Sequence, residues 1–327
     1  MSPLPSSPPP ISPVPQGVER PQWSVMIPAF NAGRYLGGTL QSVLAQAPPA
    51  DQMQICVVDD ASTDIDVRQL VSEMGQGRIE YVRQPHNVGS VANYNKCVEL
   101  ARGHWVHLLH ADDRVQPGFY AGLGDLFVRY PEAGAAFCRH RHIDSDGNEG
   151  YVTEAELPVE GLVPHWLQTL ATEQRLQFVC IAIRRSVYEA LGGFFGAEVG
   201  VDWEMWVRIA SRYPFAYTPR TLADYRVHGA SITGAKLVSG QNVEELLWAV
   251  KATARYLPPD VRDSVAKQAV ALIALDAVRS AGNLWRWGFD AKSVRSLLAQ
   301  ALSLSRAPRL CWWAVKLYIK TVLNIRR

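Results

Sequence analysis

The sequence predicts an α/β protein, in which a mostly parallel β-sheet has helices on both faces and is followed by a helical region. Two observations predict this fold class. Between residues 23 and 113, short apolar runs alternate with amphipathic segments of helical length. The apolar runs are hydrophobic at successive positions, which is typical of strands that are covered on both faces. Beyond residue 235, only helix-like segments follow.

The expected elements follow one another in a regular order. We predict strands at 23–30, 53–62, 78–84 and 104–113, separated by helices at 34–46, 64–74 and 90–103. The helical segments have apolar residues at helical spacing, and Gly103 ends the third of them. In the C-terminal region we expect four further helices, at 242–257, 265–288, 290–305 and 309–327.

These elements divide the chain into three expected parts. Residues 1–21 are rich in proline and serine and cannot bury a core, so we expect a disordered tail. The tail has neither a charged start nor an apolar centre, so we do not expect a secretory signal there. Residues 22–235 form the α/β domain, and residues 236–327 form the helical region. No apolar run reaches the roughly 18 residues that argue for a membrane-spanning helix.

The net charge and the cysteines indicate which partners and which cell compartment to expect. The chain has 48% hydrophobic and 20% charged residues and a net charge of +2. Because this charge is nearly balanced, we expect no nucleic-acid partner. The five cysteines are widely spread and form no CxxC pair, which favours reduced thiols in the cytoplasm over disulfides or a thiolate zinc site.

Polar clusters follow three of the predicted strands. The strand ends are Pro28-Ala29-Phe30-Asn31, Asp59-Asp60-Ala61-Ser62 and His110-Ala111-Asp112-Asp113. A single acidic pair is commonly a loop or helix cap, but two pairs at the same edge of a parallel sheet would converge. Converging carboxylates need a cation between them, and a divalent ion with a phosphate-bearing ligand fits that need. The chain has neither a GxGxxG dinucleotide motif nor a GxxxxGK[ST] phosphate loop.

An ordered set of blocks resembles a known family. "VMIPAFNAGRYL", "VVDDASTD", "HNVGSVANYNKCVELARGHWVHLLHADD" and "VDWEMWVRIA" are similar to successive blocks of family-two glycosyltransferases, which have the GT-A fold. The match runs over residues 23–232, about two-thirds of the chain. It implies a nucleotide-sugar donor, a divalent metal ion (Mn²⁺ or Mg²⁺) and transfer to an acceptor hydroxyl.

The resemblance assigns donor-binding roles by position. It gives the nucleotide pocket to Pro28, Phe30 and Asn31, the base and ribose to Asp59 and Asp60, and the ribose and diphosphate to Asn87, Gly89 and Asn95. Family members often have an arginine before that last asparagine, where this chain has Tyr94.

The same resemblance implies a metal site in the "HADD" block. Asp112 or Asp113 matches the metal ligand, Asp112 also contacts the donor, and His110 replaces the first acidic residue of the motif. A histidine there can ligate a metal or donate to a phosphate, and we expect it to hydrogen-bond the donor. His228, in "YRVH", either completes the metal shell or touches the diphosphate, with a structural hydrogen bond as the alternative.

Asp202, in "VDWEMWVRIA", is the expected catalytic base. An acceptor hydroxyl is a poor nucleophile until its proton is removed. The resemblance aligns Asp202 with the family's base, although Val201 replaces the glutamate that commonly precedes it. The alternatives are a helix N-cap for Asp202, and Glu204 as the base. One base without a second carboxylate nucleophile implies inversion at the anomeric carbon.

The remaining histidines are not expected to bind metal. His107 points to the opposite strand face from His104 and His110, which themselves lie about 20 Å apart at about 3.3 Å per residue. His140 and His142 share a strand face, which we expect to be solvated or to lie on the acceptor side.

We therefore expect an inverting glycosyltransferase that uses a UDP- or dTDP-sugar and a glycan or lipid-linked acceptor in cell-surface polysaccharide synthesis. The alternative is a catalytically silent nucleotide-sugar-binding protein. The basic, aromatic helix at 309–327 is expected to contact the inner face of a membrane peripherally, or else to pack on its own domain or on a partner subunit of a homo-oligomer.

Overall fold

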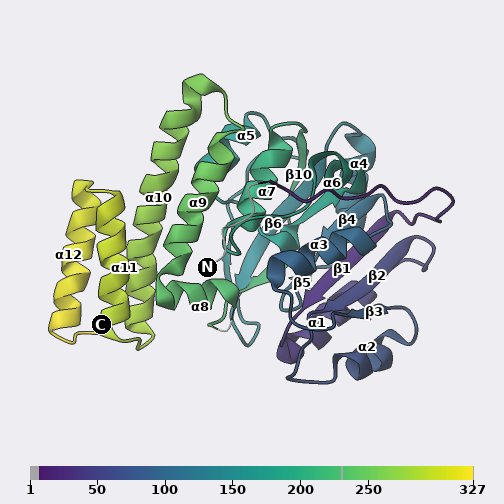
Figure 1. The fold of residues 1–327 in the computed structure, drawn as a ribbon, viewed down its shortest axis with the longest axis horizontal. Helices are drawn as coiled ribbons and strands as arrows, with labels where there is room; N and C mark the ends of the chain where they lie inside the picture. Colours follow the sequence, from purple (N-terminus) through teal and green to yellow (C-terminus); the bar gives the residue numbers. More distant parts are fainter. Residues whose placement is uncertain (1–6, 230, 327) are drawn as a thin grey trace. The chain divides into compact units, whose positions relative to one another are not determined.

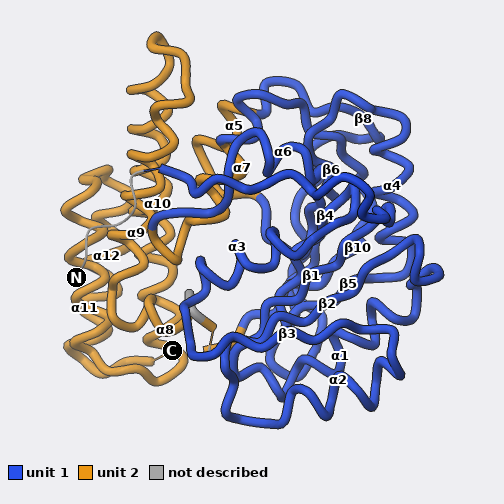
Figure 2. Tube along the Cα trace, turned by 45° about the vertical axis from the view of Figure 1, so that its right-hand side comes forward, with its two compact units in different colours: residues 1–166, 176–196, 208–227 blue, residues 167–175, 197–207, 228–327 orange. Residues whose placement is uncertain are grey.

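A computed structural model describes residues 7–229 and 231–326, without the side chains of residues 232 and 233 (Figure 1). The chain divides into two compact units (Figure 2). Unit 1 comprises the chain up to Trp166, with 176–196 and 208–227. Unit 2 comprises 167–175, 197–207 and 228 onward. The units therefore divide at residue 227, whereas the domain boundary expected after residue 235 stays a prediction.

Unit 1 is built on one ten-stranded sheet. Its strands are β1 (Trp23–Ala29), β2 (Met53–Asp59), β3 (Glu80–Arg83), β4 (Trp105–Leu108), β5 (Arg114–Val115), β6 (Ala135–Ile143), β7 (Glu149–Val152), β8 (Gly161–Leu162), β9 (Ile181–Arg184) and β10 (Phe215–Arg226). The order along the sheet is β3-β2-β1-β4-β9-β6-β10-β5, with β7 beside β6 and β8 beside β10. Strands β3, β2, β1 and β4 are parallel, as are β6 and β10, while β9 runs antiparallel to both of its neighbours.

Helices α1 (Gly33–Leu44), α2 (Val67–Gly75) and α3 (Ser90–Leu100) connect the parallel strands β1 to β4. Helix α4 (Phe119–Arg129) lies between β5 and β6 in the chain, and α6 (Arg185–Leu191) follows β9. The chain moves outward from β1 through β2 to β3 and then returns to β4 on the other side of β1. Because such crossovers are right-handed, α3 lies on the opposite face of the sheet from α1 and α2 (Figure 1). The expected α/β architecture is confirmed.

The continuous apolar runs predicted the central strands because both of their faces are covered. Every residue of β1, β2 and β4 is buried, whereas β3, at the edge, is half-exposed. The expected helices are also present, with shorter bounds. Helix α2 begins at Val67 rather than at 64, because the Asp66 side chain caps it by accepting from the Gln69 backbone N–H at 2.9 Å.

The N-terminal segment differs from the expected disordered tail over its described part, 7–21. Ile11 is only 4% exposed. The carbonyl of Pro9 accepts from Gly193 N–H at 2.8 Å, and that of Ser12 accepts from Arg185 at 3.0 Å. Proline lacks an N–H but keeps its carbonyl, so a proline-rich segment can still be fixed by hydrogen bonds from its neighbours. Residues 1–6 lie outside the described part.

Unit 2 is helical. It contains α5 (Trp166–Thr172) except for its first residue and the first part of α7 (Val201–Ala210), together with α8 (Ile232–Ser239), α9 (Gln241–Ala254), α10 (Pro259–Arg286), α11 (Ala291–Leu304) and α12 (Pro308–Val322). The last four confirm the expected C-terminal helices, and α10 packs against α9, α11 and α12. Over the described residues, no helix combines the length and the apolar composition that crossing a membrane requires.

Candidate active site

The polar block after β4 lies at the point where the order of the strands reverses. Strand β1 has β2 on one side and β4 on the other, and the helices that lead to these two strands cover opposite faces. In open α/β sheets, ligands bind beyond the carboxyl ends of the strands at this point. Phe30 and Asn31 follow β1 there, and residues 109–113 follow β4.

Contacts from two elements fix the turn His110–Asp113. Its own backbone closes it, since Asp113 N–H donates to the His110 carbonyl at 3.2 Å. The Thr39 hydroxyl of α1 lies 2.9 Å and 2.7 Å from the carbonyl oxygens of Ala111 and Asp113. Arg226, at the end of β10, donates its side-chain Nε to the Asp112 carbonyl at 2.7 Å and its backbone N–H to Asp113 Oδ1 at 2.8 Å. The turn is therefore held in one conformation from both sides.

His110, Asp112 and Asp113 form a group that can hold a metal ion. One ligand atom from each residue lies within 4.8 Å of those of the other two. The Nε2 atom of His110 is buried and has no hydrogen-bond partner. Burial lowers the pKa of His110 despite the nearby charge of Asp112, so the ring is neutral and able to ligate. Burial, with the charge of Asp112, raises the pKa of Asp113 well above its usual range.

This chemistry fits a divalent ion. Two carboxylates and a neutral imidazole are ligands that Mn²⁺ accepts, and a buried ring nitrogen without a partner indicates a missing one. A cation beside Asp112 and Asp113 would also offset the repulsion between them, which adds to the effect of burial in raising the pKa of Asp113. The structure groups His110 with the two aspartates, which fits the metal-ligand alternative, and its expected contact with the donor stays a prediction.

Two aromatic rings hold His110 in place. The Tyr94 ring stacks on it with centroids 5.2 Å apart and planes 20° apart, and the Phe178 ring lies 4.5 Å away at 32°. Phe178 belongs to a short 3₁₀ turn, Phe178–Cys180, far from the motif in sequence. Tyr94 therefore has a packing role at the position where the resemblance leads one to expect an arginine. Sequence reasoning missed Phe178, because no motif includes it.

Asp59, predicted to bind the base or ribose, is fully buried and bonded to protein groups. Its Oδ1 accepts from Ser62 N–H at 2.9 Å, and its Oδ2 accepts from Tyr81 hydroxyl at 2.7 Å and from Arg83. Burial alone would raise the pKa of Asp59, but the hydrogen bonds from Ser62 and Tyr81 and the charge of Arg83 outweigh it and lower the pKa.

Asp60 orders the loop that begins α3. Its two carboxylate oxygens accept from Val88 N–H at 2.8 Å and from Gly89 N–H at 3.1 Å. Gly89 N–H also lies 3.0 Å from Asn87 Oδ1. Gly89 has φ +88°, a region that favours glycine. The predicted donor contacts of Asp59, Asp60, Asn87 and Gly89 stay predictions, and each of these residues also has a structural role.

The loop after β1 carries an exposed aromatic ring. Phe30 is 49% exposed, whereas Pro28 is buried within β1. Asn31 joins this loop to the one after β2, because its N–H donates to Ser62 Oγ at 3.0 Å and its Oδ1 accepts from Thr63 N–H at 2.8 Å. Phe30 and Asn31 are therefore exposed to a ligand, whereas Pro28 is not, and the nucleotide-pocket assignment stays a prediction.

Asn95 is bonded to the chain through both polar atoms of its side chain. Oδ1 accepts from Phe194 N–H at 2.7 Å, and Nδ2 donates to the Phe194 carbonyl at 2.8 Å. A Cβ on Gly193 would lie 2.3 Å from the same Oδ1, so only glycine fits there. Asn95 thus fixes the loop before Phe195, and its predicted contact with the diphosphate stays a prediction.

In unit 2, Asp202 is a buried carboxylate with a raised pKa. It is 6% exposed and lies in the first turn of α7. Its Oδ1 accepts from Trp203 N–H at 2.8 Å, and its Oδ2 accepts from Gln174 at 2.7 Å. Burial raises the pKa of Asp202 to about 6 although both hydrogen bonds lower it. A base whose pKa lies near the working pH is suited to general base catalysis.

Glu204, the alternative base, has a different environment. It is fully buried and accepts from the Tyr256 hydroxyl at 2.7 Å and from Arg255 at 3.3 Å. These contacts join α7 to the end of α9 within unit 2, which favours a structural role. His228 also belongs to unit 2, and its carbonyl accepts from the Ser231 hydroxyl at 2.9 Å. Its assignment to the metal stays a prediction.

Two other histidines, His107 and His140, are buried in unit 1, whereas His104 is exposed. His107 is fully buried between Tyr120 hydroxyl at 3.3 Å and the Val179 carbonyl at 3.2 Å, and burial lowers its pKa to about 3. His140 and His142 share a strand face and stack with centroids 5.3 Å apart. His140 is buried rather than solvated as expected, and its pKa is lowered to about 3 by burial.

Comparison with protein families matches residues 24–192, just over half of the chain, to the family described as Glycosyl transferase family 2. The chain belongs to glycosyl transferase family 2. The matched range contains β2, β3, β4 and all of β1 except Trp23, and it includes His110, Asp112 and Asp113 as well as Asn95. It ends before Asp202.

Curated proteins similar in sequence include one that matches about two-thirds of the chain. An uncharacterized protein of Mycobacterium tuberculosis is 27% identical over 68% of this chain and 73% of its own length. The chondroitin synthase of Escherichia coli is 24% identical over 66% of this chain. A putative teichuronic acid biosynthesis glycosyltransferase of Bacillus subtilis, TuaG, is 36% identical over 29% of this chain. The chain spans only 30% of the chondroitin synthase and 37% of TuaG.

Solved glycosyltransferase structures share the fold. TarS residues 1–349 of Staphylococcus aureus, in complex with UDP-GlcNAc, match with a TM-score of 0.63 at 12% identity, over 93% of this chain and 91% of that chain. The mannosyltransferase PcManGT of Pyrobaculum calidifontis, in complex with GDP-Man and Mn²⁺, matches with a TM-score of 0.56 at 18% identity, over 97% and 91%. The expected GT-A fold with a C-terminal helical region is confirmed.

Proposed function

We propose that this family-2 protein is an inverting glycosyltransferase that moves a sugar from a UDP- or dTDP-sugar to a hydroxyl of a glycan or lipid-linked acceptor. The observation that carries the proposal is the group His110, Asp112 and Asp113 at the carboxyl end of β4, beside the reversal of strand order. The complex of TarS with UDP-GlcNAc supports a UDP-sugar donor, and that of PcManGT with GDP-Man and Mn²⁺ supports a nucleotide sugar with a metal ion. The chondroitin synthase and the teichuronic acid relative support a role in cell-surface polysaccharide synthesis.

The metal-binding group would hold a divalent ion through Asp112, Asp113 and the Nε2 atom of His110. Such an ion, when bound, supplies a Lewis acid that offsets the charge growing on the departing nucleoside diphosphate. Arg226 and Thr39 keep the turn rigid, so the three ligand atoms are positioned before the donor arrives. Rigid positioning of the ligands favours transfer, because little reorganisation is needed as charge develops.

Asp202 is the proposed general base. It takes the proton of the acceptor hydroxyl as the oxygen forms its bond to the anomeric carbon, and the nucleoside diphosphate leaves from the opposite face. The sugar configuration is therefore inverted. A pKa of about 6 leaves Asp202 mostly ionised at pH 7 while making it a stronger base than an exposed aspartate. Gln174 and the Trp203 N–H hold the carboxylate in place.

Calorimetry with UDP and dTDP, with and without Mn²⁺, tests the donor half of the proposal. Wild-type protein should bind a nucleoside diphosphate at least tenfold more tightly with Mn²⁺, and Asp112→Asn should lose that gain. Asp146→Asn is the matched control, because Asp146 is an exposed aspartate whose ion pair with Arg34 lies at the surface. Binding of equal strength with and without metal in all three proteins would contradict the metal assignment.

A further inference from the structure

The C-terminal part of the chain carries charge of one sign. From residue 291 to the end there are eight lysine and arginine residues and no aspartate or glutamate, although the whole chain has a net charge of only +2. Three of these basic residues lie on α12, at Arg309, Lys316 and Lys320. A segment of this charge attracts an anionic surface and repels a second copy of itself.

The outward side of α12 is apolar and exposed. Its inward side, with Leu310, Ala314 and Thr321, is buried. Facing away from these residues is an outer face that we define by five apolar residues, each 50% to 62% exposed: Trp312, Val315, Ile319, Val322 and Leu323. The spacing of three and four residues puts them along one stripe of the helix. Exposed apolar side chains gathered on one face indicate a surface that another apolar phase covers.

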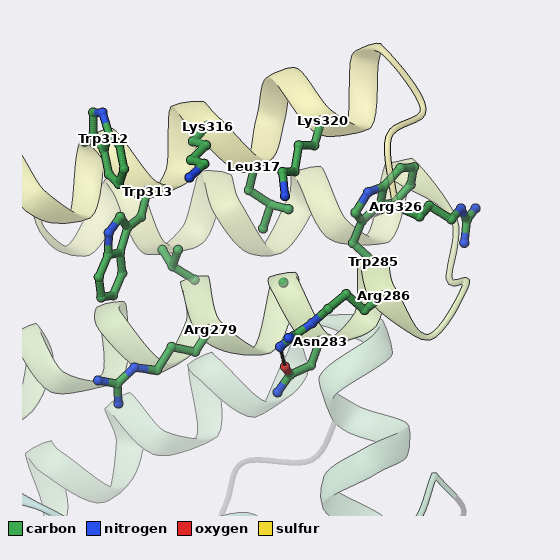
Figure 3. A pocket seen from close by; sticks show the side chains of 12 residues that line it. Arg279, Asn283, Trp285, Arg286, Trp312, Trp313, Lys316, Leu317, Lys320 and Arg326 are labelled. Carbon is green, nitrogen blue, oxygen red and sulfur yellow. Dashed lines mark hydrogen bonds between the residues drawn. The ribbon is translucent and has the colours of Figure 1, made fainter.

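A cationic groove runs beside this outer face (Figure 3). It has a volume of about 610 Å³ and lies between α10, α12 and the residues after α12. Its charged lining is entirely basic: Arg279, Arg286, Lys316, Lys320 and Arg326. Indole rings line it as well, and Lys316 Nζ lies 5.0 Å from the centroid of the Trp312 ring. No residue of the described chain that lines the groove is acidic.

We propose that α12 and this groove dock unit 2 on the surface of an anionic lipid bilayer. The outer face inserts among the acyl chains at the interface, and the groove cations lie against the lipid phosphates. Tryptophan favours this depth, because its ring is apolar and its N–H is polar. Each basic residue near an anionic surface strengthens binding by about fivefold, so a few of them with one apolar face hold a protein reversibly.

Other partners fit the outer face of α12 and the cationic groove less well than a lipid bilayer does. A soluble polyanion would satisfy the groove but would leave the outer face in water. A second copy that met this face symmetrically would bring two basic strips together, with no acidic residue between 291 and 326 to separate them. An anionic lipid surface supplies both negative charge and an apolar phase at the same place, and it therefore fits the outer face and the groove together.

Vesicle sedimentation of the full chain tests the proposal. Wild-type protein should sediment with vesicles of phosphatidylcholine mixed with phosphatidylglycerol, and much less with phosphatidylcholine alone or at high salt. Lys316→Glu and Ile319→Ser should each weaken binding to the anionic vesicles about tenfold or more. Lys267→Glu is the matched control, since Lys267 is exposed on α10 outside the groove, and it should bind like the wild type. Brominated lipid should quench tryptophan fluorescence, and Trp312→Phe should reduce the quenching.

Each alternative gives a distinct result that overturns the proposal. All variants lie at exposed positions, so circular dichroism and the melting temperature should match the wild type and identify any misfolded protein. If light scattering shows a dimer that Ile319→Ser converts to a monomer, the face is a subunit contact. If inorganic polyphosphate binds as tightly as vesicles and Ile319→Ser has no effect, the groove binds a soluble polyanion. Equal binding to neutral and anionic vesicles would also refute the proposal, because the groove cations would then not contribute.

Discussion

Replacing Asp202 with asparagine should lower turnover without lowering stability. Burial raises the pKa of Asp202 from 3.8 to about 6, and this shift corresponds to about 3 kcal/mol in favour of the protonated form. Because the pKa in the folded state is above the unfolded value, the ionised carboxylate destabilises the fold as the pH rises from about 4 to about 6. Asparagine carries no charge, so the variant avoids this cost at pH 7.

The local hydrogen bonds make the substitution a mild one. The asparagine oxygen can still accept from Trp203 N–H, and Gln174 needs only to turn its amide to pair with the new NH₂ group. We therefore expect Asp202→Asn to unfold at the same or a higher temperature than the wild type. Turnover should fall by about 10² to 10⁴, the usual contribution of a general base.

Release of nucleoside diphosphate from the donor, measured beside a thermal unfolding curve, checks both expectations. The wild-type pH profile should also fall about tenfold per pH unit below about pH 6, as Asp202 takes up its proton. Glu204→Gln is the control. It weakens the contacts to Arg255 and Tyr256, so the free energy of unfolding should fall by about 1–3 kcal/mol while turnover is largely kept. A variant Asp202→Asn that melts lower but keeps full turnover would refute the reasoning and leave Asp202 with a structural role.

Two other predictions concern the buried polar contacts around the site. Tyr81→Phe removes a donor from Asp59 and should lower the free energy of unfolding by about 1.5 kcal/mol in urea titrations. Because the pKa of Asp59 is lowered in the folded protein, the hydrogen bond from Tyr81 stabilises the fold above about pH 4, and this stabilisation should disappear as the pH falls further. If Tyr81→Phe still lowered the free energy of unfolding in acid, the charged carboxylate of Asp59 would not be the cause. Asn95→Ala removes both hydrogen bonds to Phe194 and should cost about 2 kcal/mol; an unchanged urea midpoint would contradict this.

The fold was largely predictable because its central strands are buried on both faces. A strand such as β1, in which all seven residues are buried, has apolar residues at most successive positions and can therefore be recognised in the sequence. The N-terminal segment was not predictable, because its order depends on Ile11 and on carbonyls that meet Gly193 and Arg185, more than 170 residues away. Composition carries no information about such distant partners.

The candidate site was predictable in its acidic residues but not in their surroundings. The pair Asp112-Asp113 stands out after an apolar run, and its position at a strand end follows from the sheet. The rings that enclose His110 come from α3 and from the turn at Phe178, which only the folded chain brings together. The sequence also identified Asp60 without indicating that the backbone of the next loop already satisfies its carboxylate.

The most direct test of the central claim is turnover with a panel of UDP-, dTDP- and GDP-sugars in the presence of Mn²⁺. The account predicts saturable release of nucleoside diphosphate from a UDP- or dTDP-sugar. This release should be lost on addition of a chelator and in Asp112→Asn, and reduced in Asp202→Asn. Tight, metal-dependent binding of a donor without turnover, even with polysaccharide and lipid-linked acceptors present, would contradict it and identify a catalytically silent nucleotide-sugar-binding protein.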